Sequence, residues 1–125
     1  MSRLWADHPA VTLLSDERVI LRTDRDPIAV YGTPWHGDAL WASPRSGRLH
    51  GVFFLRHNPS NVLTPIVEPL AAATLLSCSF LPFHDADGVA RTSAAAERVA
   101  HSVPCYDLGF VPDHSVIEIL TRRMG

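Results

Sequence analysis

Short apolar runs interrupted by turn-forming residues constrain the fold of this chain more than any other feature. The 125 residues include 10 prolines and 7 glycines, which divide the sequence into short segments. Runs of about four to eight residues rich in β-branched and aliphatic side chains are typical of strands, whereas helices need longer periodic stretches. Residues 49–56 contain an unbroken VFFL run, as in a strand buried on both faces. The sequence therefore predicts a sheet-rich fold.

Helical patterns are confined to the later part of the chain. Residues 68–78 place Leu70, Ala73 and Ser77 at helical spacing, and Pro69 suits a first helical turn. Residues 91–101 are rich in alanine, and Ser93 is a candidate N-cap. We expect strands over residues 11–15, 18–23, 28–31, 40–42, 49–56, 62–67, 103–110 and 116–121. Two of these, 40–42 and 62–67, are expected at the edges of the sheet, the second because it contains Pro65.

The predicted class is α/β or α+β, with a mixed β-sheet of short strands, two helices and a C-terminal hairpin made by residues 103–110 and 116–121. The length fits one domain, with residues 1–10 as an N-terminal extension and 122–125 as a tail. Residues 43–47 are expected to form a polar turn, and residues 80–89 a loop.

Composition excludes several classes of function. The net charge of −2 comes without any basic block, so nucleic acid is not an expected partner. Residues 1–9 lack the apolar segment of a signal peptide, and the weakly charged stretch 69–83 is too short to span a bilayer. We expect a bacterial cytoplasmic protein that does not bind membranes. Cys78 and Cys105 have no metal-site or redox spacing and are expected to be reduced and buried.

An acidic pair follows the first apolar run. Asp16 and Glu17 come directly after Leu13, Leu14 and Ser15, as acids at the end of a buried strand do where they hold a metal–nucleotide complex. The alternative is an acidic turn paired with Arg18 or Arg22. The chain contains no lysine and no glycine-rich loop before Asp16, so a P-loop lysine is not expected from it.

The segment 32–38 (GTPWHGD) concentrates unusual chemistry in one loop. Glycines and a proline restrict its backbone while Trp35, His36 and Asp38 are presented together. A histidine near carboxylates suits acid–base catalysis or metal ligation, whereas the alternative is a structural turn fixed by Trp35 packing. His84, Asp85 and Asp87 form a polar loop that lacks the later bidentate ligand of a calcium site.

Four segments, taken in order and spacing, carry a resemblance to a known family: 15–19 (SDERV), 30–37 (VYGTPWHG), 51–55 (GVFFL, with Asn61 and Pro65) and 103–108 (VPCYDL). They resemble the C-terminal half of HPr kinase-like proteins, bacterial relatives of HPr kinase/phosphorylase with a fold similar to that of phosphoenolpyruvate carboxykinase. The resemblance covers residues 11–121. It implies that Asp16 and Glu17 match the acidic pair that holds the metal and activates the attacking hydroxyl, and that His36 faces this site.

The family's P-loop segment has no counterpart here, which leads to three hypotheses. The first is a non-catalytic or degenerate HPr kinase-like domain that acts through protein association and is not an enzyme alone. The second is one half of a split kinase that binds Mg²⁺ and ATP only when another chain supplies the P-loop. The third is a small metal-dependent hydrolase using Asp16, His36 and Asp38. We expect a homo-oligomer, because the strand 11–15 would have an unpaired edge.

Overall fold

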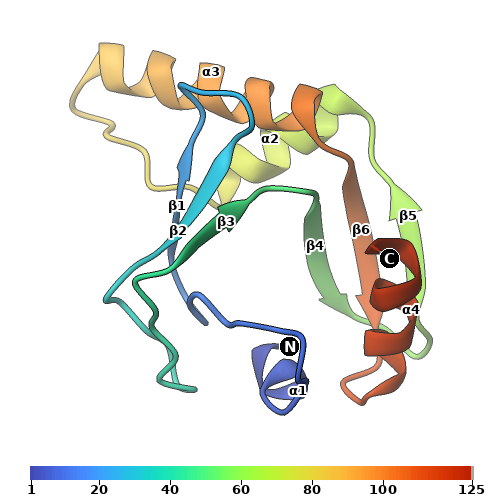
Figure 1. Cartoon of the computed structure of the whole chain (residues 1–125). Helices are drawn as coiled ribbons and strands as arrows, with labels where there is room; N and C mark the ends of the chain where they lie inside the picture. The colour runs from blue at the N-terminus through green and yellow to red at the C-terminus, as the bar shows by residue number, and fades with distance from the viewer. Residues whose placement is uncertain (125) are drawn as a thin grey trace. The chain divides into compact units, whose positions relative to one another are not determined.

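The computed structural model describes residues 1–124 and has mixed α+β content (Figure 1). This confirms the predicted class. The elements follow one another as α1 (Ser2–Trp5), β1 (Val19–Arg22), β2 (Ala29–Gly32), β3 (Ser46–Arg48), β4 (Val52–His57), β5 (Val62–Pro65), α2 (Glu68–Ser77), α3 (Ala86–Ser102), β6 (Cys105–Phe110) and α4 (Ser115–Met124).

The chain divides into two compact units. One comprises residues 1–49, 56–62 and the described residues from Gly109 onward, and the other comprises residues 50–55 and 63–108. Each unit is described below by its own contacts.

The first sheet has the strand order β1-β2-β3 and is antiparallel throughout. Its register pairs Leu21 with Val30 and Val30 with Gly47. The predicted strands 18–23 and 28–31 are confirmed as β1 and β2. The polar turn predicted over 43–47 is wrong in part, because Ser46 and Gly47 pair with β2 as strand β3.

The predicted strand 11–15 does not form. Leu14 and Ser15 contact the segment around residue 42 through one isolated bridge, Ser15 with Ala42, and through the bond from the Ser43 amide to the Leu14 carbonyl (2.9 Å). The predicted edge strand 40–42 is reduced to the same bridge. Leu40 has a positive φ of 62°, which a β-strand cannot contain.

The second sheet has the order β4-β6-β5 and is mixed. The amide of Val52 bonds to Pro104 and that of Asn58 to Phe110, so β4 and β6 advance in the same direction. Ile66 bonds to Cys105 while Asn61 accepts from Val111, so β5 runs the opposite way. Strand β5 is an edge strand, as Pro65 predicted, and the central β6 is buried at five of its six positions.

Helices α2 and α3 pack against each other (Figure 1). The core beside them contains Ala71, Ala100 and Cys105, with Val52, Phe54, Ile66 and Ala72 packed around it. The helix predicted over 68–78 is confirmed. The second helix begins at Ala86 rather than Arg91, because the Asp85 side chain accepts the amide of Asp87 (3.1 Å) and caps it. Ser93, the predicted cap, lies inside this helix.

Gly88 lies inside α3, so the loop predicted over residues 80–89 is wrong for residues 86–89. Glycine usually weakens a helix, but here a Cβ would lie 2.6 Å from Pro82 Cγ. The helix therefore needs a glycine at this position to pass close to the preceding loop.

The predicted C-terminal hairpin is wrong, because residues 115–124 form helix α4. Val116 and Leu120 are buried four residues apart, the spacing of one helix face. The Asp113 carboxylate accepts the Ser115 amide (2.9 Å) and its hydroxyl. Asp113 thereby holds the first turn of the helix, and this polar contact outweighs the strand preference of the β-branched residues.

Three smaller expectations also change. The predicted tail 122–125 is helical as far as Met124, and residue 125 lies outside the described residues. The predicted extension 1–10 contains the short helix α1. Cys78 is exposed rather than buried, whereas Cys105 is buried as predicted. Over residues 1–124, no helix is both long and apolar enough to cross a membrane.

Candidate functional site

The carboxylate of Asp16 is bonded to the backbone of the loop after β2. Its Oδ1 accepts the amide of Gly37 and its Oδ2 the amide of Ala39, both at 2.7 Å. Hydrogen bonds from an amide to a charged oxygen are short and strong. The sequence places these partners 21 and 23 residues away from Asp16, so Asp16 connects two distant segments.

Two hydroxyl side chains reinforce the same junction. Ser15 Oγ donates to the Trp35 carbonyl (3.0 Å) and accepts the amides of Glu17 and Arg18 (3.1 Å each). Thr33 Oγ1 donates to the Arg18 carbonyl (2.8 Å), and Thr33 is the one buried polar residue of residues 1–124. We call Ser15, Asp16 and Thr33 the loop clamp.

The electrostatics of Asp16 agree with this bonding. Desolvation at the junction acts to raise the pKa of Asp16, but the hydrogen bonds from Gly37 and Ala39 favour the charged form. The positive field of His36 acts in the same direction. The pKa of Asp16 therefore lies below its ordinary value of 3.8, so the carboxylate is charged at neutral pH.

The loop backbone is shaped by the clamp. A Cβ on Gly37 would lie 3.1 Å from Asp16 Oδ2, so glycine allows the two segments to approach closely. Leu40 follows in the left-handed region, with its amide bonded to the Gly37 carbonyl (3.1 Å). A large side chain in this region is strained, and two residues of this turn, Gly37 and Ala39, are bonded to Asp16.

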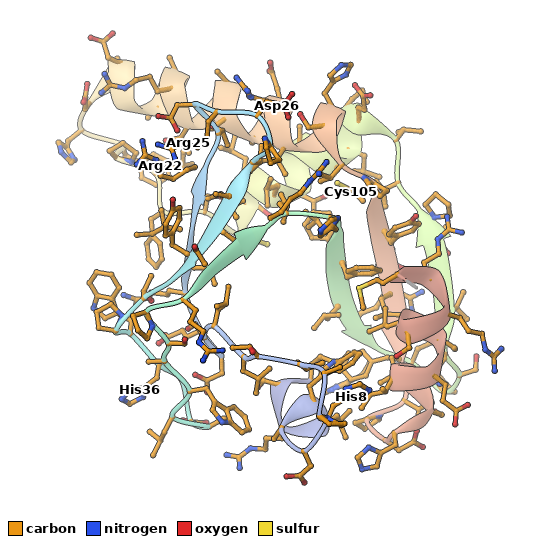
Figure 2. All side chains as sticks on the ribbon, in the orientation of Figure 1. His8, Arg22, Arg25, Asp26, His36 and Cys105 are labelled. Carbon is orange, nitrogen blue, oxygen red and sulfur yellow. The ribbon has the colours of Figure 1, made fainter. Side chains whose placement is uncertain are left out.

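Glu17 and His36, the other predicted site residues, do not share these bonds. Glu17 has a side-chain exposure of 45% and lies 3.8 Å from the guanidinium of Arg18. His36 is exposed, its Nδ1 lies 3.1 Å from the Gly37 carbonyl, and its ring extends outward from the loop (Figure 2). The structure thus brings Asp16 and His36 to one loop and leaves Glu17 facing solvent.

Trp35 is not a packing anchor. Its exposed fraction is 54%, and the guanidinium carbon of Arg18 lies 5.9 Å from its ring centroid. This is the range of a cation–π contact. The loop contacts the clamp through polar bonds, so the alternative of a turn fixed by Trp35 packing is wrong about what holds the turn.

The residues around this site do not gather into a cluster of metal-ligating side chains. Within the described part of the chain, no group of three or more His, Cys, Asp or Glu side chains is positioned to hold a metal ion. Asp38, the third member of the hydrolase hypothesis, contributes its backbone carbonyl to Arg3 (3.3 Å). Two acids and one histidine in the arrangement seen here provide at most a weak Mg²⁺ site, because Mg²⁺ requires near-octahedral oxygen ligation.

The other candidates have structural roles. Asp85 caps α3 and lies 3.8 Å from Arg91, so the 84–87 segment is a helix start and not a calcium loop. Cys105 belongs to the core, and burial raises the pKa of its thiol, which disfavours the reactive thiolate. Elsewhere, an open groove of about 530 Å³ is lined by His8, Ile117, Glu118, Thr121 and Arg122.

Sequence reasoning missed Ser15 and Thr33. Ser15 carried a local signal, because a serine hydroxyl commonly accepts the amides two or three residues later, as it does here. Thr33 carried none, since its partner carbonyl lies 15 residues earlier.

Comparison with known proteins adds no relative: no family model, no curated protein and no solved structure matches the chain.

Proposed function

We propose that this chain is a non-catalytic HPr kinase-like domain that acts by associating with protein rather than by transferring phosphate. One observation carries the proposal: both oxygens of Asp16 bind the chain's own amides at 2.7 Å. The acid that the resemblance assigns to metal binding is therefore used to hold a loop. A cytoplasmic place of action belongs to the same proposal.

The chemistry of phosphoryl transfer supports this conclusion. Such enzymes rely on positioned phosphates, a metal ion and cationic groups that stabilise the developing charge. These 125 residues contain no lysine, and both oxygens of Asp16, the acid next to the exposed Glu17, already accept backbone amides.

The second candidate is one half of a split kinase. It is favoured by the exposure of Glu17 and His36 beside Asp16 and by the two acceptor positions that a carboxylate keeps after two hydrogen bonds. A partner chain bearing a P-loop would then complete a site for Mg²⁺ and ATP. A metal-dependent hydrolase is less well supported, because Asp38 bonds to Arg3 through its backbone carbonyl and not through its carboxylate.

Calorimetric titration of Mg²⁺–ATP into the purified chain tests the proposal. Glu17→Gln is the informative variant, because it removes an exposed carboxylate and leaves the loop clamp intact. Asp16→Asn is a second variant, in which a loss of binding mixes metal ligation with loop rearrangement. We expect no heat of binding for the wild type or for either variant.

Saturable binding in the wild type that Glu17→Gln abolishes would overturn the non-catalytic proposal and establish the half-site of a split kinase. Binding that Glu17→Gln leaves unchanged would also overturn it, and would place the nucleotide away from the acidic pair. Inorganic phosphate serves as the control ligand, since it separates recognition of a nucleotide from general attraction of an anion.

A further inference from the structure

The two edges of the first sheet differ in chemistry (Figure 1). Strand β3, at one edge, is three residues long and carries only serine, glycine and arginine. Short, polar or charged edge strands are a usual way to prevent pairing with another chain. Strand β1, at the other edge, begins with the uncharged run of Val19, Ile20 and Leu21, and Val19 and Ile20 are 46% and 51% exposed. The β1 edge therefore lacks the features that prevent pairing.

The pairing within the sheet shows which backbone groups of β1 face outward. The Gly32 amide bonds to the segment that leads into β3 (3.1 Å), so the backbone groups of Gly32 point away from β1. Successive residues of an antiparallel strand point these groups to opposite sides, so Tyr31 faces β1, where its partner is Ile20. By the same alternation, Val19 and Leu21 direct their amides and carbonyls away from the sheet.

This outward edge has no partner in the part of the chain that the structure describes. Within residues 1–124, no backbone hydrogen bond joins Val19 or Leu21 to a segment outside the sheet. A row of unpaired amides and carbonyls is completed by another extended chain, which offers the same groups at the same spacing. The chemistry of the edge therefore specifies a β-strand as its partner.

The charges around β1 are complementary to themselves. Residues 17–25 read ERVILRTDR. When this segment is paired antiparallel with a second copy of itself and centred on Leu21, Arg18 lies opposite Asp24. Glu17 lies opposite Arg25 in the same pairing. Each pair occurs twice because of the two-fold symmetry, and opposite charges that face each other across two strands stabilise the pairing.

The neighbouring registers lack this match. A shift by one residue sets outward backbone groups against inward ones. The register centred on Ile20 sets Arg18 against Arg22 and Asp16 against Asp24, and the register centred on Arg22 sets that residue against itself. Like charges directly opposite each other are destabilising. Charge therefore selects the register centred on Leu21.

We propose that β1 pairs antiparallel with β1 of a second copy of this chain, centred on Leu21, so that two three-stranded sheets become one of six strands. The inference rests on the proposed function, because it names the partner through which the domain associates. The expected homo-oligomer is thereby assigned to the edge of β1 and not to residues 11–15.

The contacts within each copy are compatible with this pairing. Asp24 accepts Arg22 of its own chain (2.8 Å), yet its side chain is 61% exposed, and a carboxylate has room for a second guanidinium. The side chain of Arg18 is 41% exposed. Exposed ion pairs contribute little each, so they set the register while the backbone bonds hold the strands. A four-residue strand makes a small interface, so we expect a weak, concentration-dependent dimer.

Sedimentation velocity over a wide concentration series tests the dimer and its charges. Arg18→Asp alone and Asp24→Arg alone each set like charges opposite each other, so each should weaken the dimer about tenfold. The double variant Arg18→Asp/Asp24→Arg restores opposite charges and should dimerise like the wild type. Arg48→Asp is the matched control, because it makes the same change of charge at the β3 edge, and it should have no effect. Circular dichroism establishes that each variant is folded.

Disulfide cross-linking tests the position of the two-fold axis. In a Cys78→Ser background, Leu21→Cys lies directly opposite its own copy, with Cα atoms about 5.5 Å apart. This lies within the disulfide range of about 4.4–6.8 Å. Ile20→Cys is the control, because it lies diagonal to its own copy at about 7–8 Å. We expect mild oxidation to cross-link Leu21→Cys and to leave Ile20→Cys monomeric.

A wild type that stays monomeric at the highest concentration would overturn the inference. A double charge variant that is no better than the single ones would overturn the register, as would faster cross-linking of Ile20→Cys than of Leu21→Cys. None of these results depends on the nucleotide titration, so the dimer and the non-catalytic function can fail separately.

Discussion

The loop clamp and the α2–α3 hairpin are held together by opposite means. At the loop clamp, three polar side chains bind backbone groups up to 23 residues away, and the surrounding side chains are largely exposed. In the hairpin, and between it and strand β6, the contacts are apolar, with Ala71, Ala100 and Cys105 at the centre. The first region depends on individual hydrogen bonds and the second on burial.

This difference shows what acidic residues do in the protein. Asp85 and Asp113, like Asp16, accept backbone amides at the start of a loop or helix. In the sequence, an acid whose carboxylate accepts backbone amides cannot be distinguished from an acid that binds a ligand. The acidic pair at residues 16 and 17 is therefore weaker support for catalysis than its pattern indicates.

The largest loss of stability is expected where a buried apolar side chain is shortened. Leu108, at the centre of β6, is fully buried, so Leu108→Ala should cost about 3 kcal/mol of unfolding free energy. Urea unfolding at neutral pH measures the change. Leu55→Ala, at a side chain that is 49% exposed, is the control and should cost less than half as much. Equal costs would mean that burial does not decide stability here.

A steric change in the first sheet should have the next largest effect. A Cβ on Gly32 would lie 1.9 Å from the Ser43 carbonyl oxygen and 2.9 Å from that of Leu14. Since both obstacles are backbone, Gly32→Ala should cost about 2 kcal/mol or more. Gly47→Ala is the matched control in the same sheet, where a Cβ meets nothing within 4 Å. Thermal unfolding that ranks the two variants equally would contradict the close approach.

Removing the charge of Asp16 should have a smaller, pH-dependent effect. Asp16→Asn leaves one loop amide without its acceptor, so it should lower the midpoint of thermal unfolding at neutral pH. Because the pKa of Asp16 is depressed in the folded state, its stabilisation is complete above the ordinary value of 3.8 and is lost as the pH falls below it. The difference between wild type and variant should shrink over that acidic range.

The control is the difference in the thermal-unfolding midpoint between the wild type and Asp38→Asn, because Asp38 contacts Arg3 through its backbone carbonyl. A difference for Asp16→Asn that stays constant from neutral pH to well below 3.8 would show that its charge does not stabilise the loop.

The smallest expected effect is a gain of stability. Leu40 has a φ of 62° and is 68% exposed, so Leu40→Gly relieves backbone strain and exposes little new apolar surface. The relief should raise the unfolding free energy by about 1 kcal/mol. Leu40→Ala, which keeps a Cβ, should give no such gain, and equal stability of the two variants would remove the strain argument.

The sequence predicted the parts of the fold that periodic patterns determine. Strands β1, β2 and β5 and helix α2 lie where their apolar spacing indicated, and Pro65 correctly marked an edge strand. The errors lie where a single polar contact decides. Asp85 extends α3 beyond its alanine-rich part, and Asp113 turns a β-branched segment into α4.

The candidate site was predictable only in part. Asp16 and His36 were named from their residue types, and the structure does bring them to one loop. The partners of Asp16 are backbone amides in a segment distant in the sequence, and amides carry no sequence signal. The role of Asp16 therefore depends on a contact that only the folded chain reveals.

The most direct measurement is an NMR titration of the Gly37 and Ala39 amide protons from neutral to acidic pH. If Asp16 holds the loop, both signals should shift together with one midpoint below 3.8, and both shifts should vanish in Asp16→Asn. Amides that do not respond to pH, or that respond with a midpoint at or above 3.8, would show that the carboxylate is free of the loop. Asp16 would then be available to a metal ion, and the structural role assigned to it here would be wrong.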